Sequence, residues 1–160
     1  MEFKPIRIEI PEGCNIILGQ THFIKTAEDL YELIATTVPQ VKFGIAFTEA
    51  SGPCLIRTEG NDDALIGACV TFLSAIGAGH AFCILLRNAY PINVLNQIKN
   101  CPEVCGVYCA TANPLEVIVA STEQGNGIIG VIDGFPPKGI ESEAERKDRK
   151  ELLRKIGYKL

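Results

Sequence analysis

The chain has 160 residues, of which 47% are hydrophobic and 21% are charged, and its formal net charge is −4. This length fits one domain with a sizeable core, and the composition excludes a disordered chain. The acidic balance lacks the basic surface that nucleic-acid-binding domains show, so we expect no nucleic-acid partner.

The start of the chain and its apolar runs indicate a cytosolic protein. Met-Glu-Phe-Lys-Pro at the N-terminus lacks the features of a signal peptide. The longest apolar runs, residues 64–78 and 81–86, are shorter than the ~20 residues that a membrane span needs. We therefore expect a cytoplasmic protein with no membrane partner.

Seven cysteines are present, and no two of them have the CxxC spacing. Cys101, Cys105 and Cys109 are spaced four apart, but no histidine lies near them in the sequence, which makes a poor zinc site. We expect the cysteines to be small buried hydrophobic side chains in a reducing compartment, and we predict no metal site among them.

Hydrophobic periodicity and turn residues predict twelve elements along the chain. The segment 80–87 is continuously apolar and predicts a strand that is buried on both faces. The helices have Thr26 and Asn61 as expected N-caps, and a Ser-x-x-Glu capping box at Ser142. Strands are expected at residues 4–10, 15–19, 42–49, 54–58, 80–87, 104–109, 115–120 and 128–132, and helices at 26–38, 61–78, 90–101 and from 142 onward.

The element order, β-β-α-β-β-α-β-α-β-β-β-α, predicts a single domain over residues 1–160. Its fold class is α/β or α+β, with one mixed β-sheet and helices packed on it. The first two strands are expected to form a hairpin through Pro11-Glu-Gly13. The three strands within 104–132 are expected at the centre of the sheet.

Two polar corners join those last three strands. The first is Thr111–Pro114, which contains Asn113, and the second is Ser121–Gly127, which contains Glu123 and Gln124. Asp133 follows the final strand. This hydrogen-bonding capacity is typical of a polar ligand pocket, although ordinary hairpin turns explain the same residues.

Both histidines of the chain lie near a phenylalanine at a predicted strand end, His22 directly before Phe23 and His80 two residues before Phe82. Pairing of either imidazole with Glu49, Glu123 or Asp133 would suit acid–base chemistry. A structural histidine at a sheet edge is the alternative.

Five further residues are candidates for ligand contacts. Lys25 precedes a helix N-terminus and would suit a phosphate, or it is an ordinary surface lysine. Glu49 and Ser51 follow a strand, where Glu49 could bind Mg²⁺ or ribose hydroxyls. Asn93 and Asn96 share one helix face, although asparagine is a weak helix former.

No phosphate-binding motif is visible, because the chain has neither GxxxxGK[ST] nor a GxGxxG between a strand and a helix. Gly77-Ala-Gly79-His80 ends a predicted helix and enters a strand. That order has the wrong polarity for a phosphate held at a helix start.

Several segments resemble the family called adenosine-specific kinase, small proteins of archaea and bacteria. They extend over essentially the whole chain, in order and with similar spacing. The segments are HFIKTAEDLYE (22–32), KFGIAFTEASG (42–52), GND (60–62), IGAGHAF (76–82), YPINVLNQIK (90–99), CATANPLEVIVA (109–120), GVIDG (130–134) and LRKIGYK (153–159).

The resemblance implies a compact α/β domain that forms homo-oligomers built on trimers and binds adenosine or AMP. A kinase of this kind would phosphorylate adenosine to AMP with ATP as donor and Mg²⁺ as metal. The alternative is a non-catalytic module that binds or senses adenosine and AMP. Asn126 stands where the family pattern has a basic residue, and Ser121 where it often has Glu, which puts phosphate binding in doubt.

On this hypothesis we assign roles to ten residues by type and position. Glu123 or Asp133 would act as general base or metal ligand, with His22 as an alternative base. The substrate-binding candidates are Lys25 for phosphate and, for the nucleoside or its ribose, Glu49, Ser51, Asn93, Asn96, Asn113 and Gln124.

Overall fold

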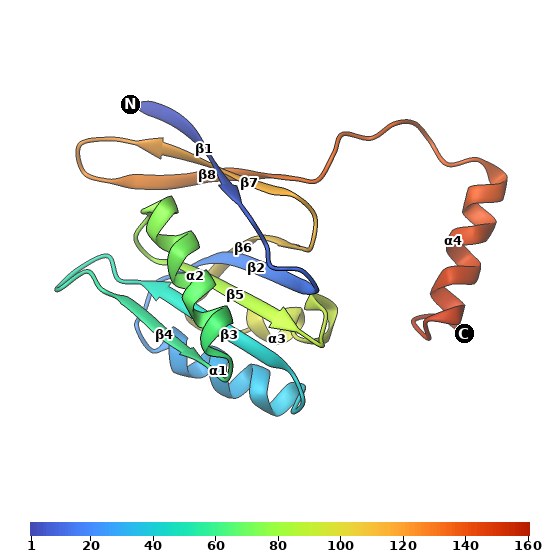
Figure 1. Ribbon diagram of the computed structural model, residues 1–160, viewed down its shortest axis with the longest axis horizontal. Helices are drawn as coiled ribbons and strands as arrows, with labels where there is room; N and C mark the ends of the chain where they lie inside the picture. Colours follow the sequence, from blue (N-terminus) through green and yellow to red (C-terminus); the bar gives the residue numbers. More distant parts are fainter.

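A computed structural model describes residues 1–160 of this protein (Figure 1). Its strands form two sheets. The strands are β1 (Glu2–Ile8), β2 (Cys14–Thr21), β3 (Lys42–Thr48), β4 (Ile56–Gly60), β5 (Ala81–Arg87), β6 (Val104–Thr111), β7 (Leu115–Ser121) and β8 (Asn126–Asp133). The helices are α1 (Thr26–Thr37), α2 (Asp63–Ile76), the 3₁₀ turn η1 (Pro91–Asn93), α3 (Leu95–Lys99) and α4 (Glu143–Lys155).

The two sheets are both antiparallel. The larger has the order β4-β3-β5-β2-β6, and the smaller has the order β1-β7-β8. The only parallel contact is an isolated bridge between Ala78 and Asn126. The predicted fold class, α/β or α+β, is confirmed, but the strands form two antiparallel sheets and not the one mixed sheet that was predicted.

Successive side chains of the central strands point to opposite faces of the larger sheet, so the core has two halves, one on each face. Leu18, Cys83 and Leu85 face α2 and the smaller sheet. Ile17 and Ile84 face the opposite way, toward α1 and α3. The molecule is thus layered, with the larger sheet in the middle (Figure 1).

Strand partners differ from the predicted ones in two places. The predicted hairpin between the first two strands does not form, because β1 pairs with β7 while β2 pairs with β5 and β6. The three strands predicted at the sheet's centre are also split, since β6 is an edge of the larger sheet and β7 and β8 belong to the smaller one. As predicted, β5 is a buried strand, and it takes the central place in the larger sheet.

Helix ends are partly as predicted. The capping box at Ser142 is confirmed, because the Ser142 hydroxyl accepts from the Glu145 amide and the Glu145 carboxylate accepts from the Ser142 amide. The N-cap of α2 is Asp62 rather than Asn61, whose side chain instead bonds the backbone of β3 and the residue before it. Thr26 is buried inside α1 and is not its cap.

The helix α4 lies apart from the rest of the molecule, at the end of an extended segment that follows β8 (Figure 1). None of its residues is buried. None of the helices combines the length and the hydrophobicity that a membrane-spanning segment requires.

Candidate functional site

Strand direction brings both histidines to one end of the larger sheet. Strands β2 and β3 are both antiparallel to β5, so their C-terminal ends lie where β5 begins. His22 directly follows β2, Glu49 directly follows β3, and His80 directly precedes β5. Three separate segments therefore place two imidazoles and a carboxylate at the same edge.

Backbone hydrogen bonds hold this edge in place. The His80 amide donates to the Thr48 carbonyl at 2.8 Å, and the His80 carbonyl accepts from the Thr21 amide at 2.9 Å. The buried Thr48 hydroxyl accepts from the Ala81 amide at 2.9 Å and lies 2.7 Å from the Ala78 carbonyl. His80 itself has a φ of 55°, a left-handed conformation that residues other than glycine adopt infrequently.

Two adjoining chambers open at this edge, and together we call them the polar cleft. The first, of about 370 Å³, lies beside the histidines, and the second, of about 540 Å³, lies beside the corner between β7 and β8. Glu49 and Ala50 line both chambers. The polar side chains that line the cleft are His22, Glu49, Ser51, His80, Thr122, Gln124 and Asn126.

Glu49 is an ionised acceptor between the chambers. Its carboxylate accepts from the Leu55 amide at 2.8 Å and from the Arg57 guanidinium at 2.7 and 2.8 Å. The Leu55 hydrogen bond and then Arg57 hold the pKa of Glu49 below its usual value. Both carboxylate oxygens therefore already have a donor, and Glu49 does not pair with either histidine.

The corner between β7 and β8 closes the other side of the cleft. The Asn126 side chain donates to the Ile76 carbonyl at 2.8 Å, which ties this corner to the C-terminal end of α2. Gly79 passes so close to the loop after β3 that a Cβ on it would lie 2.9 Å from the Cβ of Ala50. The smaller sheet, the helix end and the β3 loop therefore meet around one hollow.

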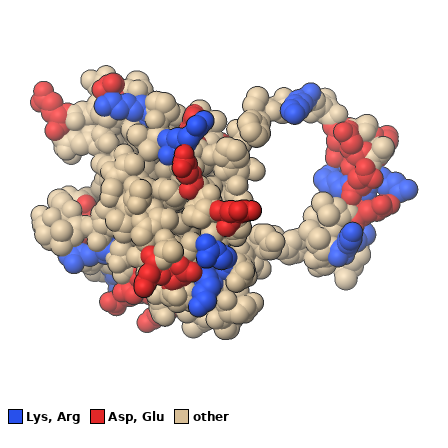
Figure 2. Space-filling model, viewed as in Figure 1, with Lys and Arg blue, Asp and Glu red and all other residues tan.

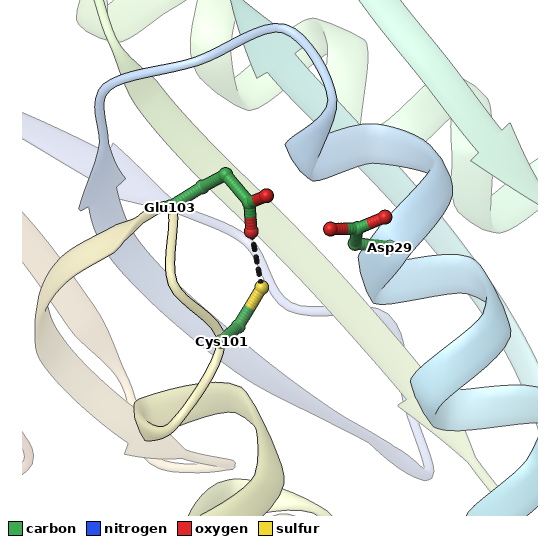
Figure 3. A group of neighbouring side chains, drawn as sticks. All are labelled: Asp29, Cys101 and Glu103. Atoms are coloured by element: carbon green, nitrogen blue, oxygen red, sulfur yellow. Dashed lines mark hydrogen bonds between the residues drawn. The ribbon is translucent and has the colours of Figure 1, made fainter.

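A cluster of charges fixes the loop that carries His22. The Lys25 ammonium pairs with Glu103 at 2.7 Å and also with Asp29. The Cys101 thiol donates to the Glu103 carboxylate at 2.8 Å (Figure 3). The Glu103 backbone carbonyl accepts from the His22 amide, at 3.1 Å.

The protonation of this cluster follows from its contacts. Burial acts to raise the pKa of Glu103, but hydrogen bonds from Cys101 and Lys25 outweigh it and lower that pKa to about 2. Burial and the neighbouring Glu103 raise the pKa of the Cys101 thiol to about 11. Asp29, Cys101 and Glu103 place ligand atoms within 4.8 Å of one another, but Lys25 already provides their cation.

The structure brings together four of the predicted site residues, namely His22, Glu49, Ser51 and Gln124. Glu123 is exposed in the same corner, between the lining residues Thr122 and Gln124.

The first polar corner lies at the opposite end of the smaller sheet. Asp133 accepts from Thr111 at 2.7 Å and from the Asn113 side chain at 3.0 Å. The seven residues of β7 separate this group from Gln124, a span of roughly 20 Å at the rise of a strand. Asn113 lines another hollow, of about 570 Å³, which contains neither histidine.

The other predicted contacts also lie outside the cleft. The Asn93 side chain accepts from the Tyr90 amide at 2.9 Å and so caps η1, and Asn96 is exposed on α3. Lys25 is occupied by its two carboxylates, so a phosphate there would compete with them.

Sequence reasoning gave too little weight to two residues of the cleft, His80 and Asn126. Gly-x-Gly-His at the start of the buried strand was a usable signal for His80, since a strand entry next to two glycines is open to a ligand. Glu103 was missed altogether, because only the antiparallel return of β6 brings it beside α1.

Comparisons with known proteins identify the family of this chain. The model of the family described as adenosine specific kinase matches residues 6–159. No curated protein matches the chain. A crystal structure of the PH1918 protein from Pyrococcus horikoshii OT3 is similar at 50% identity, covering 99% of this chain and 98% of that one, with a TM-score of 0.95. The chain therefore belongs to the adenosine-specific kinase family.

Proposed function

We propose that the polar cleft binds adenosine and that the protein transfers a phosphoryl group from ATP to a ribose hydroxyl, giving AMP and ADP. The observation that carries this proposal is the meeting of both histidines with the amide side chains of Gln124 and Asn126 in one cleft. Amide groups match the donor and acceptor edge of adenine, as they do in nucleic-acid recognition.

The helices around the cleft favour one orientation of the ligand. The C-terminal end of α2 reaches Gly77 in the second chamber, and the carbonyl end of a helix repels a phosphate. The segment that enters α1, at Phe23 and Ile24, lines the first chamber, and an amino end attracts a phosphate. We therefore place the base beside Gln124 and the reacting hydroxyl beside the histidines.

Either imidazole could act as the general base. His22 or His80 would take the proton of the ribose hydroxyl as its oxygen bonds to the γ-phosphorus of ATP and the bond from that phosphorus to the ADP oxygen breaks. Ser51 and Glu49 lie in the same chamber and would orient the ribose through hydrogen bonds.

Magnesium fits this site only together with substrate phosphates. Mg²⁺ normally takes one or two carboxylates, with water and phosphate oxygens completing its shell. Glu49, although already paired with Arg57, lines the histidine chamber where the phosphates would lie, whereas Glu123 lies beside Gln124 at the end that would hold the base. Glu49 would therefore hold the ion, which would neutralise phosphate charge during transfer.

A second function is favoured by one specific observation. Arg57, which bonds Glu49 of the cleft, and Lys25, three residues after His22, are both paired with carboxylates of the chain itself. Asn126 stands where the family resemblance implies a basic residue. A protein that binds adenosine or AMP without catalysis would need no free cation here.

Incubation of the protein with ATP, Mg²⁺ and adenosine, with AMP and ADP measured, separates the two functions. Formation of AMP and ADP in equal amounts supports the kinase. Adenosine binding without turnover supports the binding module, and no binding of adenosine or AMP would exclude both. We further propose that the protein is cytoplasmic and works as a homo-oligomer, built on trimers as the resemblance implies.

A further inference from the structure

The C-terminal arm, which we define as residues 135–160, holds its apolar side chains away from the body of its own chain. Leu152 in α4 and Ile156 at the C-cap of this helix lie one helical turn apart and are 55% and 51% exposed. The arm's other exposed large hydrophobic residues are Phe135, Ile140, Tyr158 and Leu160.

A helix in this position needs a partner to be stable. Helices of fewer than ~12–15 residues are marginal in water even with good sequences, and α4 has 13 residues. Its capping box and its exposed ion pairs, such as Arg149 with Glu141 at 2.6 Å, add only small increments. Most of the stability of a short amphipathic helix comes from packing of its apolar stripe.

The segment that precedes α4 keeps this helix from packing on the sheets of its own chain. Residues 135–142 are extended and almost wholly exposed, and they include Pro136 and Pro137. Adjacent prolines favour a stiff, extended chain. The segment carries α4 outward from the end of β8, so that the helix stands clear of both sheets (Figure 1).

The same arm position occurs in a relative. The crystal structure of the Pyrococcus horikoshii protein matches 99% of this chain with a TM-score of 0.95. Residues 138–160 are a larger share of the chain than the part that could be displaced in the relative at this TM-score. The arm must therefore lie in nearly the same position in both structures. The projection of α4 is thus shared with a chain that differs at half of its positions.

Charge identifies the partner. Residues 138–160 carry eight Lys or Arg and five Asp or Glu, a net charge of +3. Residues 1–137 carry seven Lys or Arg and fourteen Asp or Glu, a net charge of −7. Six of the eight basic side chains lie on α4, and Figure 2 shows the charged side chains of the arm, of both signs, away from the body. A basic arm and an acidic body attract each other, and every copy of the chain offers both.

We infer that the arm is exchanged between copies of the chain: the apolar stripe formed by Leu152 and Ile156 docks on the acidic body of a second copy. The inference does not depend on adenosine chemistry. The proposed homo-oligomer does not specify which surface joins the copies, and this inference assigns that role to the arm.

Hydrogen exchange of the α4 amides at several protein concentrations tests this inference on the full chain. We expect α4 to be protected at high concentration and to lose protection on dilution, in step with the fall in mass measured by light scattering. Raising the salt concentration should shift the loss to higher protein concentration, because the attraction is partly electrostatic.

Leu152→Glu and Ala144→Glu form a matched pair of variants. Both introduce the same side chain at exposed positions of α4, but Ala144 lies in the first turn, about two turns from Leu152 and three from Ile156. Leu152→Glu should raise the dissociation constant about tenfold or more and remove α4 protection, whereas Ala144→Glu should leave both unchanged.

Three results would overturn the inference. Rapid exchange of α4 at every concentration would mean that the arm docks on nothing. Protection that persists in a chain shown to be monomeric would mean that the arm folds onto its own body. Equal behaviour of Leu152→Glu and Ala144→Glu would mean that the stripe is not the contact.

Discussion

His80 adopts a left-handed backbone conformation between two strand ends, and its side chain lines the polar cleft. Such conformations cost free energy in residues other than glycine, and they concentrate at functional sites. The hydrogen bonds of His80 to Thr48 and Thr21 hold it in this conformation. The structure thus gives His80 a weight equal to that of His22 as a candidate base.

Replacement of each histidine by asparagine tests this assignment, because asparagine tolerates the left-handed conformation but is not a base. The variant that removes the true base should lower AMP formation by about a hundredfold or more, with adenosine affinity within about threefold of wild type. Steady-state turnover and calorimetric binding measure the two quantities. Unchanged turnover in both His22→Asn and His80→Asn would exclude imidazole catalysis.

Glu103 makes stability depend on pH. Its side chain is 3% exposed, and its pKa in the folded protein is lowered to about 2 from an ordinary value of 4.5. A carboxylate with a depressed pKa stabilises the fold above its unfolded pKa, and this contribution is lost as pH falls toward its folded pKa. The loss should therefore occur between about pH 4.5 and pH 2.

Glu103→Gln keeps the shape of the side chain but removes its charge. At pH 7 the variant should be less stable than wild type by about 1–3 kcal/mol, because Lys25 loses a buried partner. The difference should shrink as pH falls from 4.5 toward 2, as measured by denaturant unfolding of both proteins across this range. A difference that stays constant with pH would contradict the lowered pKa.

At the scale of elements, α2 and the segment that follows it offer a matched pair of glycines. Gly67 lies in the middle of α2 with nothing within 4 Å of a Cβ built on it, whereas a Cβ on Gly79 would meet Ala50. The two positions therefore separate an effect on helix stability from an effect on the cleft.

Gly67→Ala should stabilise the protein by about 0.5–1 kcal/mol, since alanine loses less conformational entropy in a helix. Gly79→Ala should displace the loop after β3 and weaken adenosine binding about tenfold, because Ala50 lines both chambers. Thermal unfolding and adenosine titration of both variants check these outcomes. Unaltered adenosine affinity in Gly79→Ala would show that this close approach does not shape the site.

Sequence patterns predicted which segments are strands but not how they pair. Alternation in β1 marks a buried and an exposed face, yet it carries no information about a partner, and β1 pairs with β7 more than a hundred residues later. The short loop at Pro11–Gly13 suggested a hairpin, but the chain changes sheets there instead. Continuous hydrophobicity correctly predicted β5, because a short apolar run without alternation is typical of a strand that is covered on both faces.

The same limit explains the outcome for the site. Gln124 and Asn113 were both placed in one pocket because both belong to corners of the same three strands. A strand has two ends, however, and successive corners lie at opposite ends of it. His22, Glu49 and Gln124 come together through pairing between distant segments, which residue types alone do not reveal.

For the whole molecule, the two sheets act as the walls of the cleft. The larger sheet contributes His22, Glu49 and His80 from its strand ends, and the smaller sheet contributes Gln124 from its corner. The hydrogen bond from Asn126 to Ile76 ties the corner of the smaller sheet to the end of α2, which packs on the larger sheet. A ligand bound there would contact both sheets, so adenosine should also stabilise their packing.

Adenosine should therefore raise the midpoint of thermal unfolding, by an amount that grows with the logarithm of its concentration relative to its dissociation constant. Asn126→Ala should reduce this stabilisation, because it removes the bond that fixes the corner. Calorimetry with and without adenosine measures the shift. An equal shift in wild type and Asn126→Ala would argue against binding across the two sheets.

The central claim is that adenosine binds in the polar cleft and not at the opposite end of β7. Titration of adenosine into Gln124→Ala and Asn113→Ala tests it directly, because these amide side chains lie in separate hollows. We predict that Gln124→Ala weakens binding about tenfold or more and that Asn113→Ala binds as wild type does. Weakened binding in Asn113→Ala with normal binding in Gln124→Ala would contradict the claim.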